Sequence, residues 1–317
     1  MSPLSRRGFL VTSLSGSVVA LSSLSRGAED APAEPIIDIH QHTNYRERTA
    51  EQLIAHQRKM GVTHTILLPA GSDVKRPSTA DGKHNGLGGV GAGGNETALT
   101  MSRQHPKEFF FGANEVTDLP EARAEIAKYL DSGAIIIGEQ KFGVECDSAE
   151  SQVLYKLAGE YRVPILMHFQ HGTYNLGFER LHKMLEKYPT TTFIGHAQTW
   201  WANIDKNHTD QKVLYPKGKV TPGGLTDRYL ADYPNMFADM SAGSGLNALT
   251  RDEDHTRGFL DRHQNKILYG SDCDDRVGMG PGCSGSQTIA AIRKLAPNKV
   301  AERKILFENA KKLFRIS

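Results

Sequence analysis

The chain has 317 residues, and its 38 Lys and Arg residues nearly balance its 36 Asp and Glu residues, for a formal net charge of +2. This balance, without a basic run on a helical face, excludes nucleic acid as an expected partner. The apolar content is ordinary at 38%, and no apolar run matches the helices of a membrane protein. These features predict a soluble globular protein with a large core, built as one barrel or as two smaller domains.

Residues 1–33 have the pattern of an export signal. The segment SRRGFL (residues 5–10) resembles a twin-arginine signal, and the moderately apolar residues 11–24 after it are too few to span a bilayer. Small residues near Ala28 and from Ala31 to Ala33 offer a cleavage site, and no cysteine precedes Cys146 as a lipid anchor. We therefore expect residues 34–317 to be the mature protein, free of the membrane and located in a bacterial periplasm or secreted.

The rest of the chain alternates between short apolar runs and helical spacings. The expected strands are residues 36–42, 64–70, 109–116, 135–142, 164–170, 192–198, 236–242 and 266–272. The expected helices are residues 49–61, 95–105, 121–132, 150–161, 178–188, 252–263, 286–295 and 300–314. This alternation predicts an α/β fold of the (β/α)8 TIM barrel type, whose usual size of about 250 residues fits residues 34–317. A doubly wound open sheet is the alternative.

Two connections are long, residues 71–94 and residues 199–223, and both follow the carboxyl end of an expected strand. Barrel active sites form at that end, so we expect these connections to be walls or lids of a pocket. The second contains Trp200, which either forms an apolar wall against substrate or packs under the loop. The first contains the pattern GVGAGG (residues 89–94), but its strand ends far upstream, which favours a flexible loop over a dinucleotide site.

Potential metal ligands recur at the carboxyl ends of four expected strands. They are His40 and His42 on the first, His168 on the fifth, His196 on the sixth and Asp272 on the eighth. Side chains alternate along a strand, so His40 and His42 share one face and can point at one ion. Histidines with a carboxylate suit zinc in a catalytic site that keeps a position open for water, and iron, manganese, cobalt or nickel remain alternatives.

These ligands lie in segments that resemble the amidohydrolase superfamily, and specifically its amidohydrolase-2 branch. The matching segments are IIDIHQH, VPILMHFQ, TFIGHAQ, MFADMSA, ILYGSD and ILFENAKKLF, which together extend over nearly all of residues 34–317. The resemblance implies a metal held by His40, His42, His168 and Asp272, with His196 beside it as a ligand or a polarising acid/base. The branch includes hydrolases of lactones, esters or amides and non-oxidative decarboxylases of carboxylated aromatic or muconate-type acids.

The fourth expected strand carries both Glu139 and Lys141 on one side. The resemblance implies either a bridging glutamate or a carboxylated lysine at this place in those barrels that hold two metals. We expect Glu139 to be the metal-site residue and favour one ion over two. A structural ion pair between the two side chains is the alternative.

We expect a small-molecule substrate, bound with the help of Trp200, His171 and Arg276, the last two of which follow the fifth and eighth strands. For each of these, a packing or solvated-loop role is the alternative. In the hydrolase hypothesis Asp272 is the general base and then acid, and His196 stabilises the oxygen on which negative charge develops. A decarboxylase is the alternative enzyme, and a non-catalytic binding barrel is the third hypothesis.

The sequence leaves two further properties open. A monomer and a homo-oligomer are both compatible with it. The three cysteines, Cys146, Cys273 and Cys283, allow at most one internal disulfide, and Cys273 with Cys283 is the nearest pair.

The export signal can be tested directly. Replacing Arg6 and Arg7 together by lysine removes the twin-arginine pair, so we expect the double variant to stay in the cytoplasm. Fractionation of a bacterial host followed by immunoblotting measures this. Periplasmic recovery equal to that of the unchanged chain would contradict the signal.

Overall fold

Eight parallel strands follow one another in sequence order in the computed structural model, which describes residues 34–77 and 86–317. The strands are β1 (Ile37–Gln41), β2 (His64–Leu67), β3 (Phe109–Phe111), β4 (Ile137–Gln140), β5 (Ile165–His168), β6 (Phe193–His196), β7 (Met236–Asp239) and β8 (Ile267–Leu268). Residues 35–317 form one unit, and the proposed export signal in residues 1–33 lies outside the described residues.

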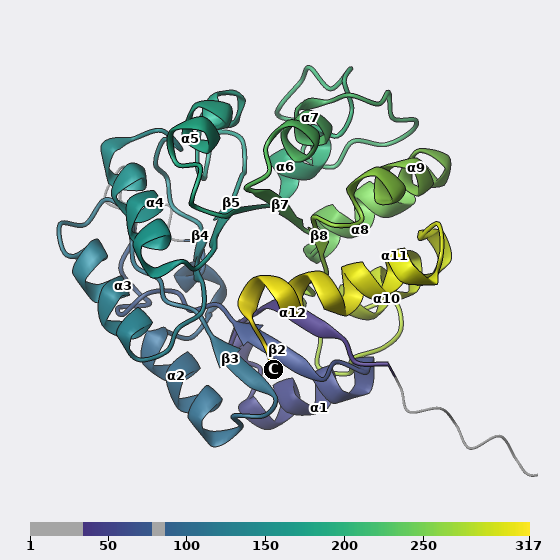
Figure 1. Cartoon of the computed structure of the whole chain (residues 1–317). Helices are drawn as coiled ribbons and strands as arrows, with labels where there is room; N and C mark the ends of the chain where they lie inside the picture. Colours follow the sequence, from purple (N-terminus) through teal and green to yellow (C-terminus); the bar gives the residue numbers. More distant parts are fainter. Residues whose placement is uncertain (1–33, 78–85) are drawn as a thin grey trace, which may run out of the picture. The chain divides into compact units, whose positions relative to one another are not determined.

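Backbone hydrogen bonds close the strands into a barrel. The strands pair in two groups, β1-β2-β3 and β4-β5-β6-β7-β8. At one seam, Ala113 after β3 accepts from the amide of Gly138 and donates to Ile136 O, both at 2.9 Å. At the other seam, the amide of Ile39 donates to Tyr269 O at 3.1 Å. The strands therefore form a ring inside the helices (Figure 1), which confirms the predicted (β/α)8 barrel over the open sheet.

Alternate strand residues divide between two hydrophobic clusters. Ile165 and Phe193 pack with the surrounding helices, whereas Leu166 and Ile194 belong to an inner cluster that includes Phe314 of the C-terminal helix. Because side chains alternate along a strand, the residues two positions beyond Leu166 and Ile194 also point inward. This alternation places His168 and His196 inside the barrel.

Twelve α-helices are present in the described residues. They are α1 (Ala50–Met60), α2 (Asn95–Gln104), α3 (Ala122–Asp131), α4 (Ala149–Tyr161), α5 (Leu181–Lys187), α6 (Gln198–Ala202), α7 (Leu225–Asp232), α8 (Ala242–Thr250), α9 (Glu253–His263), α10 (Ser284–Leu295), α11 (Lys299–Arg303) and α12 (Asn309–Phe314). The helix α1 shows why the predicted positions hold: a capping box between Thr49 and Gln52 begins it, and Gly61 with φ 81° ends it.

Helices α6, α7 and α8 were not predicted from the sequence. The helix α8 contains two glycines, which favour other conformations, and tertiary packing overrides that preference. Gly245 lies so close to Met240 that an added Cβ would be 2.9 Å from the Met240 carbonyl carbon. The helix α6 includes the first residues of the predicted loop at 199–223, so this loop is shorter than expected.

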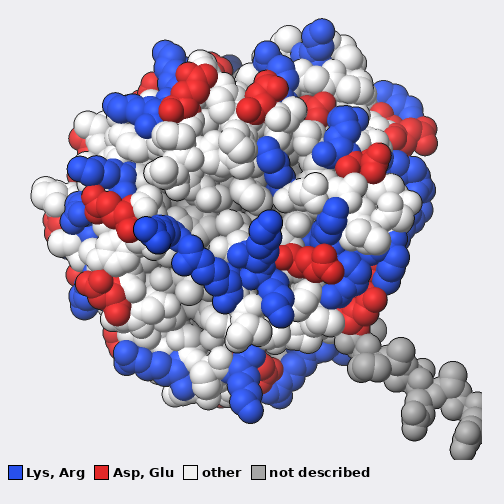
Figure 2. Space-filling model, viewed as in Figure 1, with Lys and Arg blue, Asp and Glu red and all other residues white. Residues whose placement is uncertain are grey.

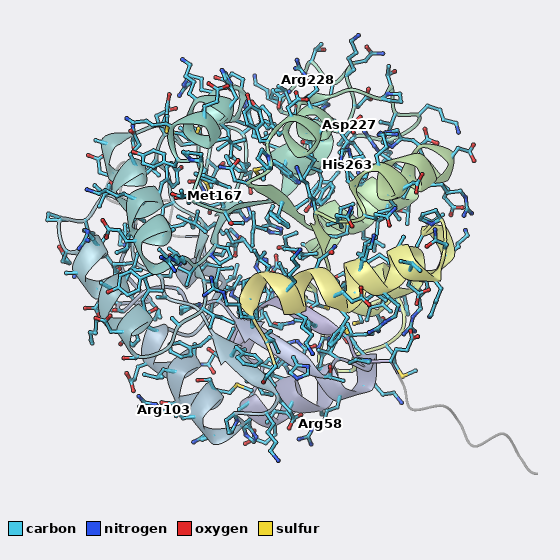
Figure 3. All side chains as sticks on the ribbon, in the orientation of Figure 1. Arg58, Arg103, Met167, Asp227, Arg228 and His263 are labelled. Carbon is cyan, nitrogen blue, oxygen red and sulfur yellow. The ribbon has the colours of Figure 1, made fainter. Side chains whose placement is uncertain are left out.

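An ion-pair group joins α7 to α9. Asp227 accepts from His263 Nε2 at 2.5 Å and from Arg262 Nη2 at 3.1 Å, and Figure 3 shows Asp227 and His263 together between the two helices. Burial raises the pKa of Asp227, but these two partners outweigh burial and lower the pKa to about 2. This carboxylate is thus ionised and holds α7 on the outer layer.

Basic side chains cross the centre of the face shown in Figure 2, over the barrel end that α12 covers. On the C-terminal helices, Arg303 of α11 and Lys311 of α12 lie 4.9 and 5.6 Å from the centroid of the Phe307 ring. Among residues 34–77 and 86–317, no helix combines the length and the hydropathy needed to cross a membrane.

Candidate metal centre

The carboxyl ends of β1, β4 and the segment after β8 bring four predicted ligands together. His40 Nε2 lies 3.2 Å from His42 Nε2, 3.2 Å from Glu139 Oε2 and 3.8 Å from Asp272 Oδ1. His42 Nε2 lies 3.4 Å from each of the same two carboxylate oxygens. His40, His42 and Glu139 are fully buried, and the Asp272 side chain is 7% exposed.

The two remaining predicted histidines complete the group from β5 and β6. His168 Nδ1 hydrogen-bonds to Glu139 Oε1, and its Nε2 lies 3.3 Å from Gln170 Oε1. His196 Nε2 is 3.6 Å from Glu139 Oε1 and 3.6 Å from Asp272 Oδ2. Glu139 therefore contacts or approaches all four histidines and is the centre of the group.

Hydrogen bonds fix which nitrogen of His40 and His42 carries the proton. A carbonyl oxygen only accepts, so His42 Nδ1 donates to Leu68 O at 2.7 Å, and His40 Nδ1 donates to Asp239 Oδ2 at 2.6 Å. In the neutral rings both Nε2 atoms then carry lone pairs, which face each other and the Glu139 carboxylate. Lone pairs and carboxylates in a buried space repel one another unless positive charge lies among them. Burial lowers the pKa of His40, but the carboxylates of Asp272, Glu139 and Asp239 outweigh burial and raise that pKa well above its usual value, so a proton on His40 or a metal ion supplies this charge.

Two buried atoms that point toward this space have no hydrogen-bond partner among the described residues. They are His196 Nε2 and Asp272 Oδ1. Buried polar atoms are almost always paired, so orphaned acceptors on two elements indicate a missing positive partner. Imidazole nitrogens with carboxylate oxygens suit zinc, manganese or iron, and the residues fit a divalent metal ion.

The electrostatics agree with a cation site. Burial raises the pKa of Glu139, but Lys141, His40 and His168 outweigh burial and lower that pKa well below its usual value. Burial likewise raises the pKa of Asp272, and His40 outweighs it, so that the Asp272 pKa is also well below its usual value. Both carboxylates are ionised and available as ligands.

A hydrogen-bonded support lies directly behind His40. Asp38 Oδ1 accepts from the backbone amides of His40 at 3.0 Å and Ser271 at 2.8 Å, and Asp38 Oδ2 accepts from Gln57 at 2.8 Å. The backbone passes so close here that a Cβ on Gly270 would lie 2.9 Å from the His40 Cβ. Asp38 thereby ties β1 to the segment that carries Asp272.

Asp239 and Ser241, which were not predicted from the sequence, hydrogen-bond to histidines of the candidate centre. Ser241 Oγ donates to Asp239 Oδ2 at 2.8 Å and accepts from His196 Nδ1 at 2.9 Å, while Asp239 also accepts from His40. One carboxylate therefore orients two histidines of the centre. The available signal was the ADMS segment, in which Asp239 and Ser241 lie two apart at the end of an expected strand.

A polar pocket of about 310 Å³ opens onto the centre. His168, His196 and Asp272 form its floor, and Lys141 and Tyr45 line it. At its rim, Arg46 Nε pairs with Asp274 Oδ2 at 2.7 Å, and Lys141 Nζ lies 5.8 Å from the centroid of the Tyr174 ring. Lys141 therefore lines the pocket beside the candidate ligands, whereas Arg46 is paired with Asp274.

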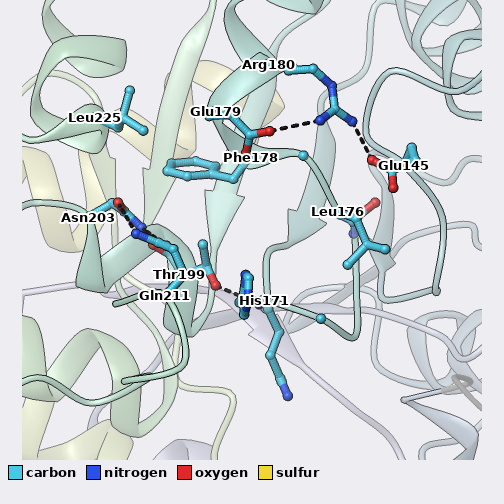
Figure 4. Close-up of a pocket in the computed structure, with 14 residues that line it drawn as sticks. Glu145, His171, Leu176, Phe178, Glu179, Arg180, Thr199, Asn203, Gln211 and Leu225 are labelled. Atoms are coloured by element: carbon cyan, nitrogen blue, oxygen red, sulfur yellow. Dashed lines mark hydrogen bonds and ion pairs between the residues drawn. The ribbon is translucent and has the colours of Figure 1, made fainter. Parts of the chain in front are cut away.

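The three predicted substrate contacts lie outside this pocket. Trp200 is fully buried, because its ring packs over Gly195, where an added Cβ would lie 2.3 Å from Trp200 Cε3. The apolar-wall prediction for Trp200 is therefore wrong, and the packing alternative holds. His171 lines a neighbouring pocket of about 490 Å³ with Arg180 and Glu145 (Figure 4), and Arg276 is exposed and donates to Arg46 O at 3.1 Å.

Solved structures share the fold at low sequence identity. An uncharacterized TIM-barrel protein from Bordetella bronchiseptica has a TM-score of 0.60 at 14% identity, with 89% of this chain and 98% of that chain covered. A probable 2-pyrone-4,6-dicarboxylic acid hydrolase from Acinetobacter baumannii has a TM-score of 0.55 at 13% identity, with 89% and 99% covered.

A third similar structure contains a metal. It is 5-carboxyvanillate decarboxylase from Novosphingobium aromaticivorans complexed with manganese, with a TM-score of 0.53 at 13% identity and coverage of 86% of this chain and 83% of that chain. Neither a family model nor a curated protein matches the sequence. The likenesses establish the TIM-barrel fold.

The role of Asp239 predicts a metal-affinity change. Asp239→Asn removes the negative charge that orients His40 and His196, so we expect apparent affinity for a divalent ion to fall about 10- to 100-fold. Asp227→Asn is the matched control, because it also removes a buried carboxylate from a histidine but lies on α7, outside the centre. Competitive titration with a chelating dye measures both. Equal affinity in the two variants would show that Asp239 does not support the ligands.

Proposed function

We propose that the chain is a metal-dependent hydrolase of the amidohydrolase superfamily that cleaves a lactone, ester or amide bond in a small, carboxylate-bearing molecule. The observation that carries this proposal is the buried set of lone pairs and carboxylates from His40, His42, Glu139 and Asp272, of which Asp272 also lines a small pocket together with His168 and His196. A buried polar group with a purely structural role would not require a cavity beside it that is large enough for a small molecule.

We propose zinc as the ion, with one ion favoured over two, and His40, His42 and Asp272 as principal ligands. A bound divalent ion polarises a carbonyl group and supplies hydroxide at neutral pH. Manganese is the alternative, because the similar decarboxylase was solved with it. Glu139, near all four histidines, is the residue best placed to add a ligand atom or to accept a second ion.

Asp272 is proposed as the general base and then acid. Its carboxylate is ionised, because nearby histidines outweigh burial in setting its pKa. Asp272 also lines the pocket, where its carboxylate can accept a proton from the attacking water. It can then return this proton to the leaving group.

His196 has a role that depends on its protonation. Ser241 donates to Asp239, so Ser241 Oγ accepts the Nδ1 proton of His196, and neutral His196 presents a lone pair at Nε2. In this form Nε2 is a ligand or a proton acceptor. His196 donates to a developing oxyanion only when both ring nitrogens are protonated. Asp239 Oδ2, 3.3 Å from Nδ1, stabilises the positive charge of that protonated ring.

Lys141 is the residue proposed to bind the substrate carboxylate. It lines the pocket between the metal ligands and the rim, and its ammonium group lies near the Tyr174 ring. The rim residue Arg46 is 65% exposed and already paired with Asp274, so it contributes less. The similarity to a probable 2-pyrone-4,6-dicarboxylic acid hydrolase is consistent with such an anionic substrate.

A non-oxidative decarboxylase is the second candidate. It is favoured by the similarity to 5-carboxyvanillate decarboxylase, and the same residues would serve it. Lys141 would orient the carboxylated ring, and the metal ligands would remain unchanged.

We also propose that the protein acts after export to the periplasm or beyond, on the basis of the twin-arginine pattern in residues 5–10.

Asp272→Asn tests the proposed chemistry. Loss of the base should lower turnover about 100-fold or more on a substrate found by surveying lactones, esters, amides and carboxylated aromatics. Asp274→Asn is the matched control, because Asp274 lies two residues away at the pocket rim, and we expect it to keep most of the turnover. Equal losses in the two variants would contradict the role of Asp272.

The reaction of the unchanged chain in oxygen-18 water separates the two candidate functions. We expect one solvent oxygen in the new carboxylate, because hydrolysis adds water across the broken bond. Release of carbon dioxide with no label in the organic product would instead assign the decarboxylase reaction.

A further inference from the structure

A second group of metal-ligating side chains lies apart from the ligands described above. It consists of His56 on α1, Cys273 after β8 and Cys283 at the start of α10, all of them buried. Cys283 Sγ lies 3.8 Å from Cys273 Sγ and 3.4 Å from His56 Nε2. The thioether sulfur of Met60, one helical turn beyond His56, is 3.5 Å from Cys283 Sγ. Three separate segments thus converge on one point.

The spacing of these atoms matches shared coordination of one ion. With bonds of about 2.3 Å to sulfur and about 2.0 Å to nitrogen, a tetrahedral ion separates two sulfur ligands by about 3.8 Å and a sulfur from a nitrogen by about 3.5 Å. A disulfide requires the two sulfur atoms at about 2.05 Å. The three cysteines are free thiols in this structure, and the observed distances agree with coordination.

The chain also packs unusually closely around this group. A Cβ on Gly278 would lie 2.5 Å from His56 O, and a Cβ on Gly285 would lie 2.8 Å from Met60 Sδ. Asp275 Oδ2 accepts from the amides of Val277 and Gly278 at 2.9 and 2.6 Å and lies 3.9 Å from His56 Nε2. The loop of residues 273–283 is therefore folded tightly against α1 at the point where the four donors meet.

We propose that His56, Cys273 and Cys283, with Met60 as the fourth donor, bind one thiophilic d10 cation, Zn²⁺ or Cu⁺, in a structural site. Thiolate and thioether donors select such ions, whereas the histidine and carboxylate centre contains no sulfur. Each cysteine releases its proton on binding. Two thiolates with Zn²⁺ carry no net charge, which suits a buried position. The donors surround the ion, as in closed structural sites.

The site would fix the segment that follows Asp272. Cys273 is its direct neighbour in the chain, and the clamped loop carries Asp274 at the pocket rim. The proposed ion would therefore join α1 to α10 and hold this wall of the pocket in place. It shares no ligand with the group formed by His40, His42, Glu139 and Asp272.

Cobalt substitution tests the site without relying on activity. Only a sulfur-ligated cobalt ion gives intense thiolate-to-metal charge-transfer absorption, so the full-length protein loaded with Co²⁺ should show this band. Cys283→Ser should abolish the band and lower the metal content by one equivalent per chain. Cys146→Ser, the matched control, removes a buried cysteine outside the cluster and should leave the band and the metal content unchanged.

Further readouts keep the proposal testable if Cys283→Ser fails to fold. His56→Gln should shift and weaken the band, and Met60→Leu should shift it. Loss of the ion should lower the melting temperature of the unchanged protein. No charge-transfer band in the unchanged protein would overturn the proposal, as would an intact mass two hydrogens below that of the reduced protein, which marks a disulfide.

Discussion

The structure depends on the electrostatics of one small buried space. The Nε2 lone pairs of His40 and His42 are aimed at each other and at Glu139, because Asp239 and Leu68 O hold the protons on the opposite nitrogens. Desolvated charges and lone pairs of one sign do not stay together without compensation. A cation at this point converts the repulsion into attraction, and the surrounding hydrogen bonds become supports for its ligands.

Residues with positive φ lie just beyond the ends of three strands that carry or precede these groups. Non-glycine residues with positive φ follow β6, β7 and the β8 segment: Ala197 at 82°, Ala242 at 59° and Asp272 at 39°. Such conformations cost about 1–3 kcal/mol each and persist where surrounding structure enforces them, often at functional sites. The amide of Asp272 donates to His40 O at 2.8 Å, so the strained residue is tied to the ligand strand.

The apolar periodicity of the sequence predicted those features that depend on neighbouring residues in the chain. The strands, most helices and the inward rows that end at His168 and His196 follow from apolar periodicity, as does the convergence of ligands at one barrel end. Contacts between distant segments were not predictable. The burial of Trp200 depends on Gly195, and the role of Asp239 depends on two histidines from other strands. His56 meets Cys273 and Cys283 only in the folded chain, because more than 200 residues separate it from them in sequence.

The most direct test of the account is a crystal structure of the purified, metal-loaded protein with anomalous scattering measured at the absorption edge of the ion found by elemental analysis. We expect an anomalous peak about 2.0–2.2 Å from His40 Nε2, His42 Nε2 and an Asp272 carboxylate oxygen. A protein that contains no stoichiometric divalent ion, and shows no peak between these atoms, would contradict the account.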